Sequence, residues 1–185
     1  MLTGKEIVKD SDPILRKRAE MVQMPPSKED QETLRLMHEF VVNSQDEKFV
    51  EKHQTRAGIG LAAPQISISK RMIAIHVPQG EDEPISYMLF NPRIISHSSE
   101  RIYIDTGEGC LSVDQQYPGF VSRYAKIRVK ANNIDGEEIQ LTLTGLTAIC
   151  IQHEIDHLNG ILFYDHINKQ DPFAEIENAT LLVRS

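Results

Sequence analysis

The sequence has little of what would place a protein in a membrane, outside the cell or on nucleic acid. No run approaches the roughly 18 consecutive apolar residues that a membrane-spanning helix needs, and the N-terminal stretch MLTGKEIVKDSD has no apolar segment typical of a secretory signal. Only two cysteines occur, Cys110 and Cys150, too few for a disulfide framework. The net charge of -7 argues against nonspecific binding to nucleic acid. We therefore expect a cytoplasmic protein in a reducing compartment, with no DNA and no membrane partner.

What is present fits one domain of the α+β class. The 185 residues, 40% of them hydrophobic, are enough to bury a sizeable core. No internal repeat, low-complexity segment or long linker divides the chain, so we expect a single domain covering residues 1–185. Most of the expected strands follow one another before one strongly marked helix, and that order favours α+β over a doubly wound sheet.

Local signals place two helices ahead of the strands. Asp12 followed by Pro13 marks the start of a short helix, and Ser27 opens a capping pattern that predicts a helix over residues 28–43. The polar residues 44–56 are expected to end that helix and form a solvated loop. Alternating or short apolar runs predict strands near residues 71–77, 87–90, 93–98, 101–107, 119–134, 137–145 and, at a sheet edge, 180–183.

The strongest functional signal is the pattern H-E-x-x-H in the stretch QHEIDHLNG. On a helix, His153 and His157 stand one turn apart on the same face, so both imidazoles can bind one metal ion. Glu154 then lies beside the ion without being needed as a ligand and is free to move protons. Thr144 can cap the start of this helix and Gly160 can end it. The alternative is a buried helix with two hydrogen-bonded histidines and an ion-paired glutamate, but burying that charge among apolar neighbours is costly without a function.

A catalytic metal site usually has three protein ligands and one open position, so a third ligand is needed. In zinc peptidases with this motif it lies downstream, where the candidates are Asp165, His166, Glu175 and Glu177. Cys150 shares the helix with both histidines, and three ligands strung over about 10 Å of one helix cannot easily converge on one ion. Cys110 lies in a strand-like segment beside Gly109, which permits close backbone approach. Spacing alone does not choose between Cys110 and a downstream carboxylate.

Three segments together are similar to the motifs of a known family. GIGLAAPQ (58–65), EGCLS (108–112) and QHEIDHLNG (152–160) resemble, in order, the three motifs of peptide deformylases. The likeness runs through most of the chain. The chain resembles the longer class found in Gram-positive bacteria in its length, in the insertion around residues 44–56 and in its short tail. The resemblance implies an α+β fold in which antiparallel β-sheets surround a central metal-binding helix that carries the H-E-x-x-H pattern.

The resemblance also implies one divalent metal ion as cofactor. The ion expected in the cell is Fe²⁺, which Ni²⁺, Co²⁺ or Zn²⁺ readily replaces. The implied ligands are Cys110, His153 and His157. The sequence does not distinguish Fe²⁺ from Zn²⁺, and the affinity order of divalent metals alone favours the later ones.

The implied reaction removes the N-formyl group from the initiator methionine of new proteins and releases formate. Its partners are N-formylmethionyl nascent chains, which suggests proximity to the ribosome. Glu154 would take a proton from water and pass it to the leaving amine. By the same resemblance, the side-chain amide of Gln65 and the backbone N–H of Leu111 would donate hydrogen bonds to the oxyanion.

The substrate-binding residues are likewise implied by the resemblance. The peptide backbone would lie against an edge formed by Gly58, Ile59 and Gly60, because glycine lets an extended chain come close. The methionine side chain would enter an apolar pocket near Ile149, Cys150 and His153, although Cys150 fits plain core packing equally well.

Glu108 and Gly109 complete the expected substrate-binding segment. Glu108 is also expected to pair with Arg123 and so hold the segment that carries Cys110.

Two rival functions stay open on the sequence alone. One is a zinc endopeptidase that uses a downstream third ligand, and the other is a homologue that binds peptides without turnover.

Overall fold

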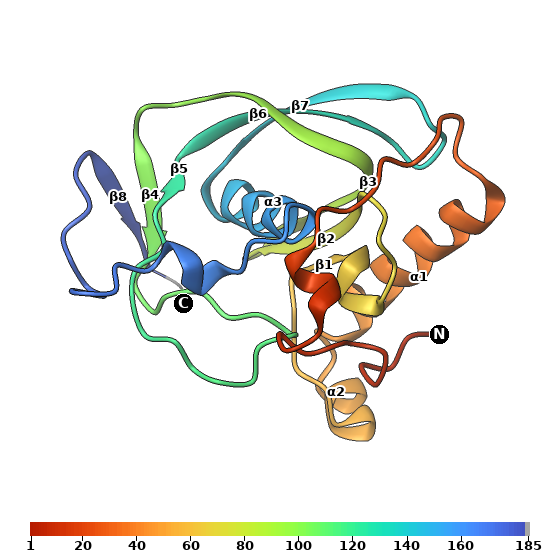
Figure 1. The fold of residues 1–185 in the computed structure, drawn as a ribbon, viewed down its shortest axis with the longest axis horizontal. Coiled ribbons are helices and arrows are strands. Elements are labelled where there is room, and N and C mark those ends of the chain that lie inside the picture. Colours follow the sequence, from red (N-terminus) through yellow and green to blue (C-terminus); the bar gives the residue numbers. More distant parts are fainter. Residues whose placement is uncertain (184–185) are drawn as a thin grey trace.

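Two β-sheets curl around one long helix (Figure 1), in a computed structural model that describes residues 1–183. The larger sheet is antiparallel, and its strands follow the order β1 (Gly60–Ala62), β2 (Met72–Gln79), β3 (Asp82–His97), β6 (Lys126–Asn132), β7 (Glu138–Thr144). The smaller sheet has the order β5 (Arg123–Tyr124), β4 (Arg101–Ile104), β8 (Ala179–Leu182). The helix α3 (Gly145–Leu158) contacts strands of both sheets. The expected α+β class with antiparallel sheet is therefore present.

Strand β2 is buried on both faces, which explains its nearly continuous apolar sequence. Successive side chains of a strand point to opposite sides. Ile73, Ile75 and Val77 pack in one hydrophobic cluster with α3 residues, whereas Met72 and Ala74 pack in a second cluster. That second cluster includes buried residues of the helix α1 (Lys28–Asn43). The larger sheet is thus held between α1 and α3, and α3 cannot shift without disturbing the core.

The two expected helix starts are confirmed, and one expected loop is wrong. The carboxylate of Asp12 accepts a hydrogen bond from the backbone of Ile14 at the start of a 3-10 turn, Pro13–Arg16. Ser27 caps α1 by accepting from the N–H of Asp30 at 3.0 Å. Within the segment expected to be a loop, a second helix α2 (Glu47–His53) begins at Asp46, whose carboxylate accepts from the N–H of Phe49. Asp46 is a residue type typical of an N-cap, but the polar composition of residues 44–56 favoured a loop and this signal was missed.

The strands differ from expectation at several places, and the strand predicted over residues 119–134 is divided into β5 and β6. The two predicted strands around Asn91–Pro92 form one strand, β3, because Asn91 adopts a φ of 51° and the register shifts there as a bulge. The segment around Cys110 is not a strand but a loop with one isolated bridge, between Cys110 and Val113. The predicted edge strand near the C-terminus is present as β8, but it pairs with β4 in parallel, so the smaller sheet is not wholly antiparallel.

The predictions for the two ends of α3 are confirmed only in part. Thr144 occupies the N-cap position, but its side chain accepts no hydrogen bond there. Gly160, with a φ of 74°, follows the helix end as expected, and a side chain at this position would collide with the carbonyl of Arg16. In residues 1–183, none of the helices combines the length and the apolar character that crossing a membrane requires.

Candidate metal centre

Cys110 and the two histidines of the H-E-x-x-H pattern converge. The sulfur of Cys110 and one ring nitrogen each of His153 and His157 lie within 4.8 Å of one another, and among residues 1–183 no other such group occurs. The Sγ of Cys110 is 3.3 Å from Nε2 of His157. A thiolate and two imidazoles are a donor set typical of zinc and of neighbouring transition metals. The downstream alternatives Asp165 and His166 instead bind Arg16 and Asp156.

The segment before Cys110 fixes the orientation of His153. Nδ1 of His153 lies 2.8 Å from Oε1 of Glu108, and Arg123 donates two hydrogen bonds of 2.9 Å to the same carboxylate. Burial raises the pKa of Glu108, but Arg123 and His153 outweigh that effect and hold it at about 2. Since the carboxylate is ionised, it accepts a hydrogen bond from a proton-bearing Nδ1 of His153, and Nε2 is the nitrogen that would face a bound ion. The expected pair of Glu108 and Arg123 is therefore present, and it connects the loop to α3.

The charge state of Cys110 also suits a ligand. Burial raises the pKa of its thiol, but the neighbouring His157 and His153 overcome that effect and place the pKa well below its ordinary value. The thiolate is the form that binds metal ions. The two imidazoles and the sulfur thus form a preassembled donor set that suits a divalent cation.

Glu154 is buried beside this cluster, and its contacts with the described residues do not account for the burial of its carboxylate. The residue is 4% exposed, and its Oε2 has no hydrogen-bond partner within the described part of the chain. Burial raises the pKa of its carboxyl to about 6. A carboxylate that titrates close to neutral pH, with one oxygen free, is suited to accept and return a proton. The unpartnered oxygen also indicates that a further polar group, such as a water molecule, belongs in the site.

The side chain of Gln65 is locked in place with its amide toward Cys110. Gln65 is 1% exposed, and its Oε1 accepts from the N–H of Ala62 at 2.9 Å. Its Nε2 donates to the hydroxyl of Ser112 at 3.1 Å and lies 3.5 Å from the sulfur of Cys110. The short helical turn Ala63–Ile66, directly after β1, holds the residue there.

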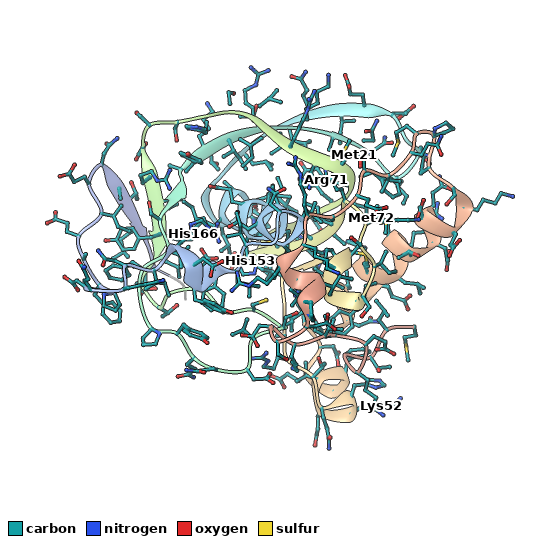
Figure 2. The ribbon with its side chains drawn as sticks, in the orientation of Figure 1. Met21, Lys52, Arg71, Met72, His153 and His166 are labelled. Atoms are coloured by element: carbon teal, nitrogen blue, oxygen red, sulfur yellow. The ribbon has the colours of Figure 1, made fainter. Side chains whose placement is uncertain are left out.

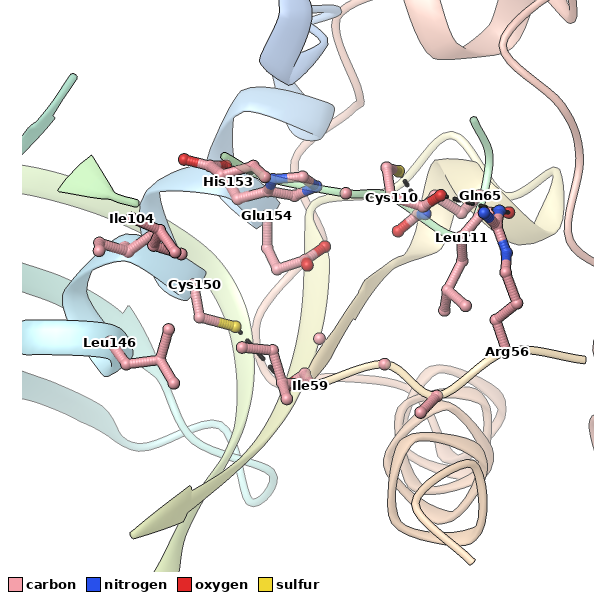
Figure 3. A pocket seen from close by; sticks show the side chains of 16 residues that line it. Arg56, Ile59, Gln65, Ile104, Cys110, Leu111, Leu146, Cys150, His153 and Glu154 are labelled. Atoms are coloured by element: carbon pink, nitrogen blue, oxygen red, sulfur yellow. Dashed lines mark hydrogen bonds and ion pairs between the residues drawn. The ribbon is translucent and has the colours of Figure 1, made fainter. Parts of the chain in front are cut away.

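A cavity of about 210 Å³ opens beside the cluster (Figure 3). Of the residues singled out from the sequence, it is lined by Gly58, Ile59, Gly60, Gln65, Glu108, Gly109, Cys110, Leu111, Ile149, Cys150, His153 and Glu154. His157 lies behind, 1% exposed. In Figure 3, Glu154 stands between the side of the cavity with Cys110 and Leu111 and the side with Cys150 and Leu146. The structure thus brings the three sequence motifs to one place.

Glycine is required at position 60 of this wall. A Cβ there would lie 2.4 Å from Oε1 of Glu154 and 3.0 Å from the sulfur of Cys150. At Gly109, by contrast, an added Cβ meets nothing within 4 Å. The close approach expected at Gly109 is therefore not made within the chain itself. Strand β1 is the edge of its sheet, because it pairs with β2 alone.

Four lining residues were not identified from the sequence: Arg56, Ala57, Ile104 and Leu146. Leu146 precedes Ile149 and Cys150 by three and four positions, so helical periodicity could have found it. Arg56 gave no signal, because it belongs to a polar segment. Its Nη2 lies within 3.1 Å of the backbone carbonyls of Cys110, Leu111 and Val113.

With this geometry in view, the comparisons with known proteins are decisive. The sequence profile of the polypeptide deformylase family matches residues 4–173. The chain belongs to the peptide deformylase family. Enzymes of this family are metal-dependent hydrolases that remove the N-formyl group from the N-terminal methionine of newly made proteins. The resemblance identified from the three motifs is thereby confirmed.

Relatives share the whole length of the chain. It is 58% identical to peptide deformylase 2 of Bacillus cereus over 184 residues, covering 100% of both proteins. With peptide deformylase 2 of Bacillus subtilis it is 53% identical, again over 100% of both. These organisms agree with the expected Gram-positive class. The actinonin-bound crystal structure of a class I type b peptide deformylase from Acinetobacter baumannii superposes with a TM-score of 0.71 at 33% identity, covering 88% of this chain and 97% of that one.

Proposed function

We propose that residues 1–185 form one catalytic domain in which Cys110, His153 and His157 hold a divalent metal ion, with α3 as the central metal-binding helix. The ion expected in the cell is Fe²⁺, and Ni²⁺, Co²⁺ or Zn²⁺ can take its place. When bound, such an ion acts as a Lewis acid that makes a water molecule acidic enough to ionise near neutral pH. The convergence of the three donors supports this assignment.

The substrate is an N-formylmethionyl peptide that lies extended along the free edge of β1. Its backbone pairs with Ile59 and Gly60, and Gly60 has no side chain to obstruct close approach. The methionine side chain enters the apolar part of the cavity formed by Ile149 and Cys150, with Leu146 beside them. This part of the cavity fits an unbranched thioether and explains recognition of the first residue.

Glu154 is the proton carrier of the reaction. It takes a proton from the attacking water and returns it to the amine nitrogen as the C–N bond of the formamide breaks. The amide of Gln65 and the backbone N–H of Leu111 donate hydrogen bonds to the oxyanion that forms at the formyl carbon. Glu108 holds the ring of His153 through Nδ1, and Gly109 leaves room beside the reacting group.

The enzyme acts in the cytoplasm on nascent chains, close to translating ribosomes. The observation that carries the proposal is the buried, unpartnered oxygen of Glu154 beside the Cys110, His153 and His157 cluster.

The test is formate release from formyl-methionyl peptides by anaerobically purified, metal-loaded protein. The wild type should release formate, and the Glu154→Ala variant should keep the metal and release almost none. Wild-type protein that holds a full complement of metal and releases no formate would refute the proposal. Cleavage of internal peptide bonds instead would favour the endopeptidase.

A further inference from the structure

A second cavity, of about 560 Å³, lies on a different face of α3 from the candidate metal centre. Gln152, Ile155, Asp156 and Asn159 of the α3 region line it, whereas the metal-side cavity is lined by Ile149, His153 and their neighbours. The two cavities share no lining residue. We call this second cavity the arginine groove, because its wall contains Arg18, Arg71, Arg93, Arg101 and Arg123.

The arginine groove carries positive charge that the described residues do not balance. Among the described residues, the acidic residue that lines it is Asp156, which already accepts hydrogen bonds from Arg123 and His166. Arg18, Arg71, Arg93 and Arg101 form no ion pair with any carboxylate in residues 1–183. An anionic ligand would balance this charge.

Arg71 makes the imbalance acute because it is buried. The residue is 7% exposed (it is labelled beside α3 in Figure 2), and burial together with the charge of Arg18 lowers its pKa. Its Nη1 donates to the carbonyl of Leu158 and to the side chain of Asn159, both at 3.0 Å. The partial negative charge at the C-terminal end of α3 accounts for that contact. Nε and Nη2 of Arg71 have no partner among the described residues, and neither is among the side-chain atoms that are fully shielded from solvent, so both remain available to a ligand in the groove.

A second guanidinium is held rigidly in place at the same groove. Arg101 donates from Nε to the hydroxyl of Ser122 at 2.8 Å and from Nη2 to its carbonyl at 2.9 Å. It also stacks over the ring of Tyr124, with 4.0 Å between its central carbon and the ring centroid. A fixed guanidinium loses little conformational entropy when it binds a ligand. Arg71, Arg101 and Arg123 are therefore held in place by hydrogen bonds, and the exposed Arg18 and Arg93 complete the wall of the groove.

We propose that the arginine groove binds a phosphate-bearing anion. The planar fork of a guanidinium matches two oxygens of a phosphate group. A single carboxylate would neutralise one of the four unpaired arginines, whereas linked phosphates offer enough charge and oxygens for several. The volume suits a small ligand. Two sources share this chemistry, namely a small polyphosphorylated molecule and the phosphates of an RNA segment.

The first test is a calorimetric titration of the metal-loaded full chain with pyrophosphate at physiological ionic strength. The wild type should bind it saturably at one site. The variant Arg18→Gln/Arg93→Gln removes two exposed arginines of the groove and should bind at least about tenfold more weakly. The matched control Arg35→Gln/Arg128→Gln removes two exposed arginines outside the groove and changes the net charge equally. It should bind like the wild type, and all three proteins should release formate at the same rate.

A short RNA oligonucleotide forms the second arm and identifies the source of the phosphate. Binding of RNA that pyrophosphate displaces, and that the groove variant loses, supports the site with nucleic acid as one ligand. Pyrophosphate binding without RNA binding supports a small molecule. The proposal fails if neither probe binds the wild type saturably, or if the control variant loses as much affinity as the groove variant. Because both variants retain the metal, anion binding at the metal cannot mimic the predicted difference.

Discussion

The two faces of α3 differ in the sign of the charge that gathers beside them. On the metal face, the thiol of Cys110, two imidazoles and the ionised Glu108 gather donor atoms that suit a cation. On the groove face, four arginines have no carboxylate partner among the described residues, which suits an anion. Arg123 joins the faces, because it donates to Glu108 on one side and to Asp156 on the other. On this account the charge gathered on each face indicates the sign of the ligand that we propose for it.

The largest expected effect comes from removing the proton carrier on the metal face. Glu154→Gln should lower kcat by about 10²- to 10⁴-fold, because the proton transfer loses its base while the metal ligands stay intact. Formate release and metal content, measured on the same preparation, check this. A variant that loses both together would show that Glu154 serves the metal site rather than the reaction.

The next largest effect is expected at the first of the two ion pairs of Arg123, the one with Glu108. Glu108→Ala should weaken metal binding by about 10- to 100-fold, because His153 loses the acceptor that orients its ring. It should also lower the free energy of unfolding by about 3–5 kcal/mol, because Arg123 is left buried without that partner. Competitive metal titration and denaturant unfolding provide the two readouts. Unchanged stability and activity would refute the role of this pair.

A smaller effect tests the close approach at the edge of β1. Gly60→Ala should reduce kcat/KM about tenfold or more, because the added Cβ displaces the carboxylate of Glu154. Gly109→Ala is the matched control for the chain's own packing, since its Cβ meets no atom within 4 Å. Steady-state kinetics with equal metal loading distinguish them. Equal losses in both variants would mean that substrate contact, not displacement of Glu154, governs the effect.

The smallest effect is expected at the second ion pair of Arg123, the one with Asp156 on the groove face. Asp156→Asn removes the charge that binds Arg123 and His166 but leaves Glu108 on His153. Metal affinity should change less than about fivefold, while the free energy of unfolding falls by about 1–3 kcal/mol. A loss of metal affinity as large as that of Glu108→Ala would contradict the separation of the two faces.

The sequence predicts the metal face better than the groove face for a physical reason. His153, Glu154 and His157 follow the period of one helix, so local spacing is enough to bring them together. Cys110 comes from a loop, and only the family resemblance, not its spacing, selected it over downstream carboxylates. Arg56 and the groove arginines are distant in sequence and follow no period, so only the folded chain reveals them. The same limit explains why the sequence did not predict the bulge at Asn91 or the parallel pairing of β8.

The most direct measurement of the central claim is X-ray absorption at the metal edge of Ni²⁺-loaded protein. The ligands assigned here predict one sulfur and two imidazole nitrogens around the ion. In Cys110→Ser the sulfur contribution should disappear, whereas Cys150→Ser should leave the spectrum unchanged. A wild-type spectrum without sulfur, or one that survives the loss of Cys110, would contradict the assignment of the metal centre.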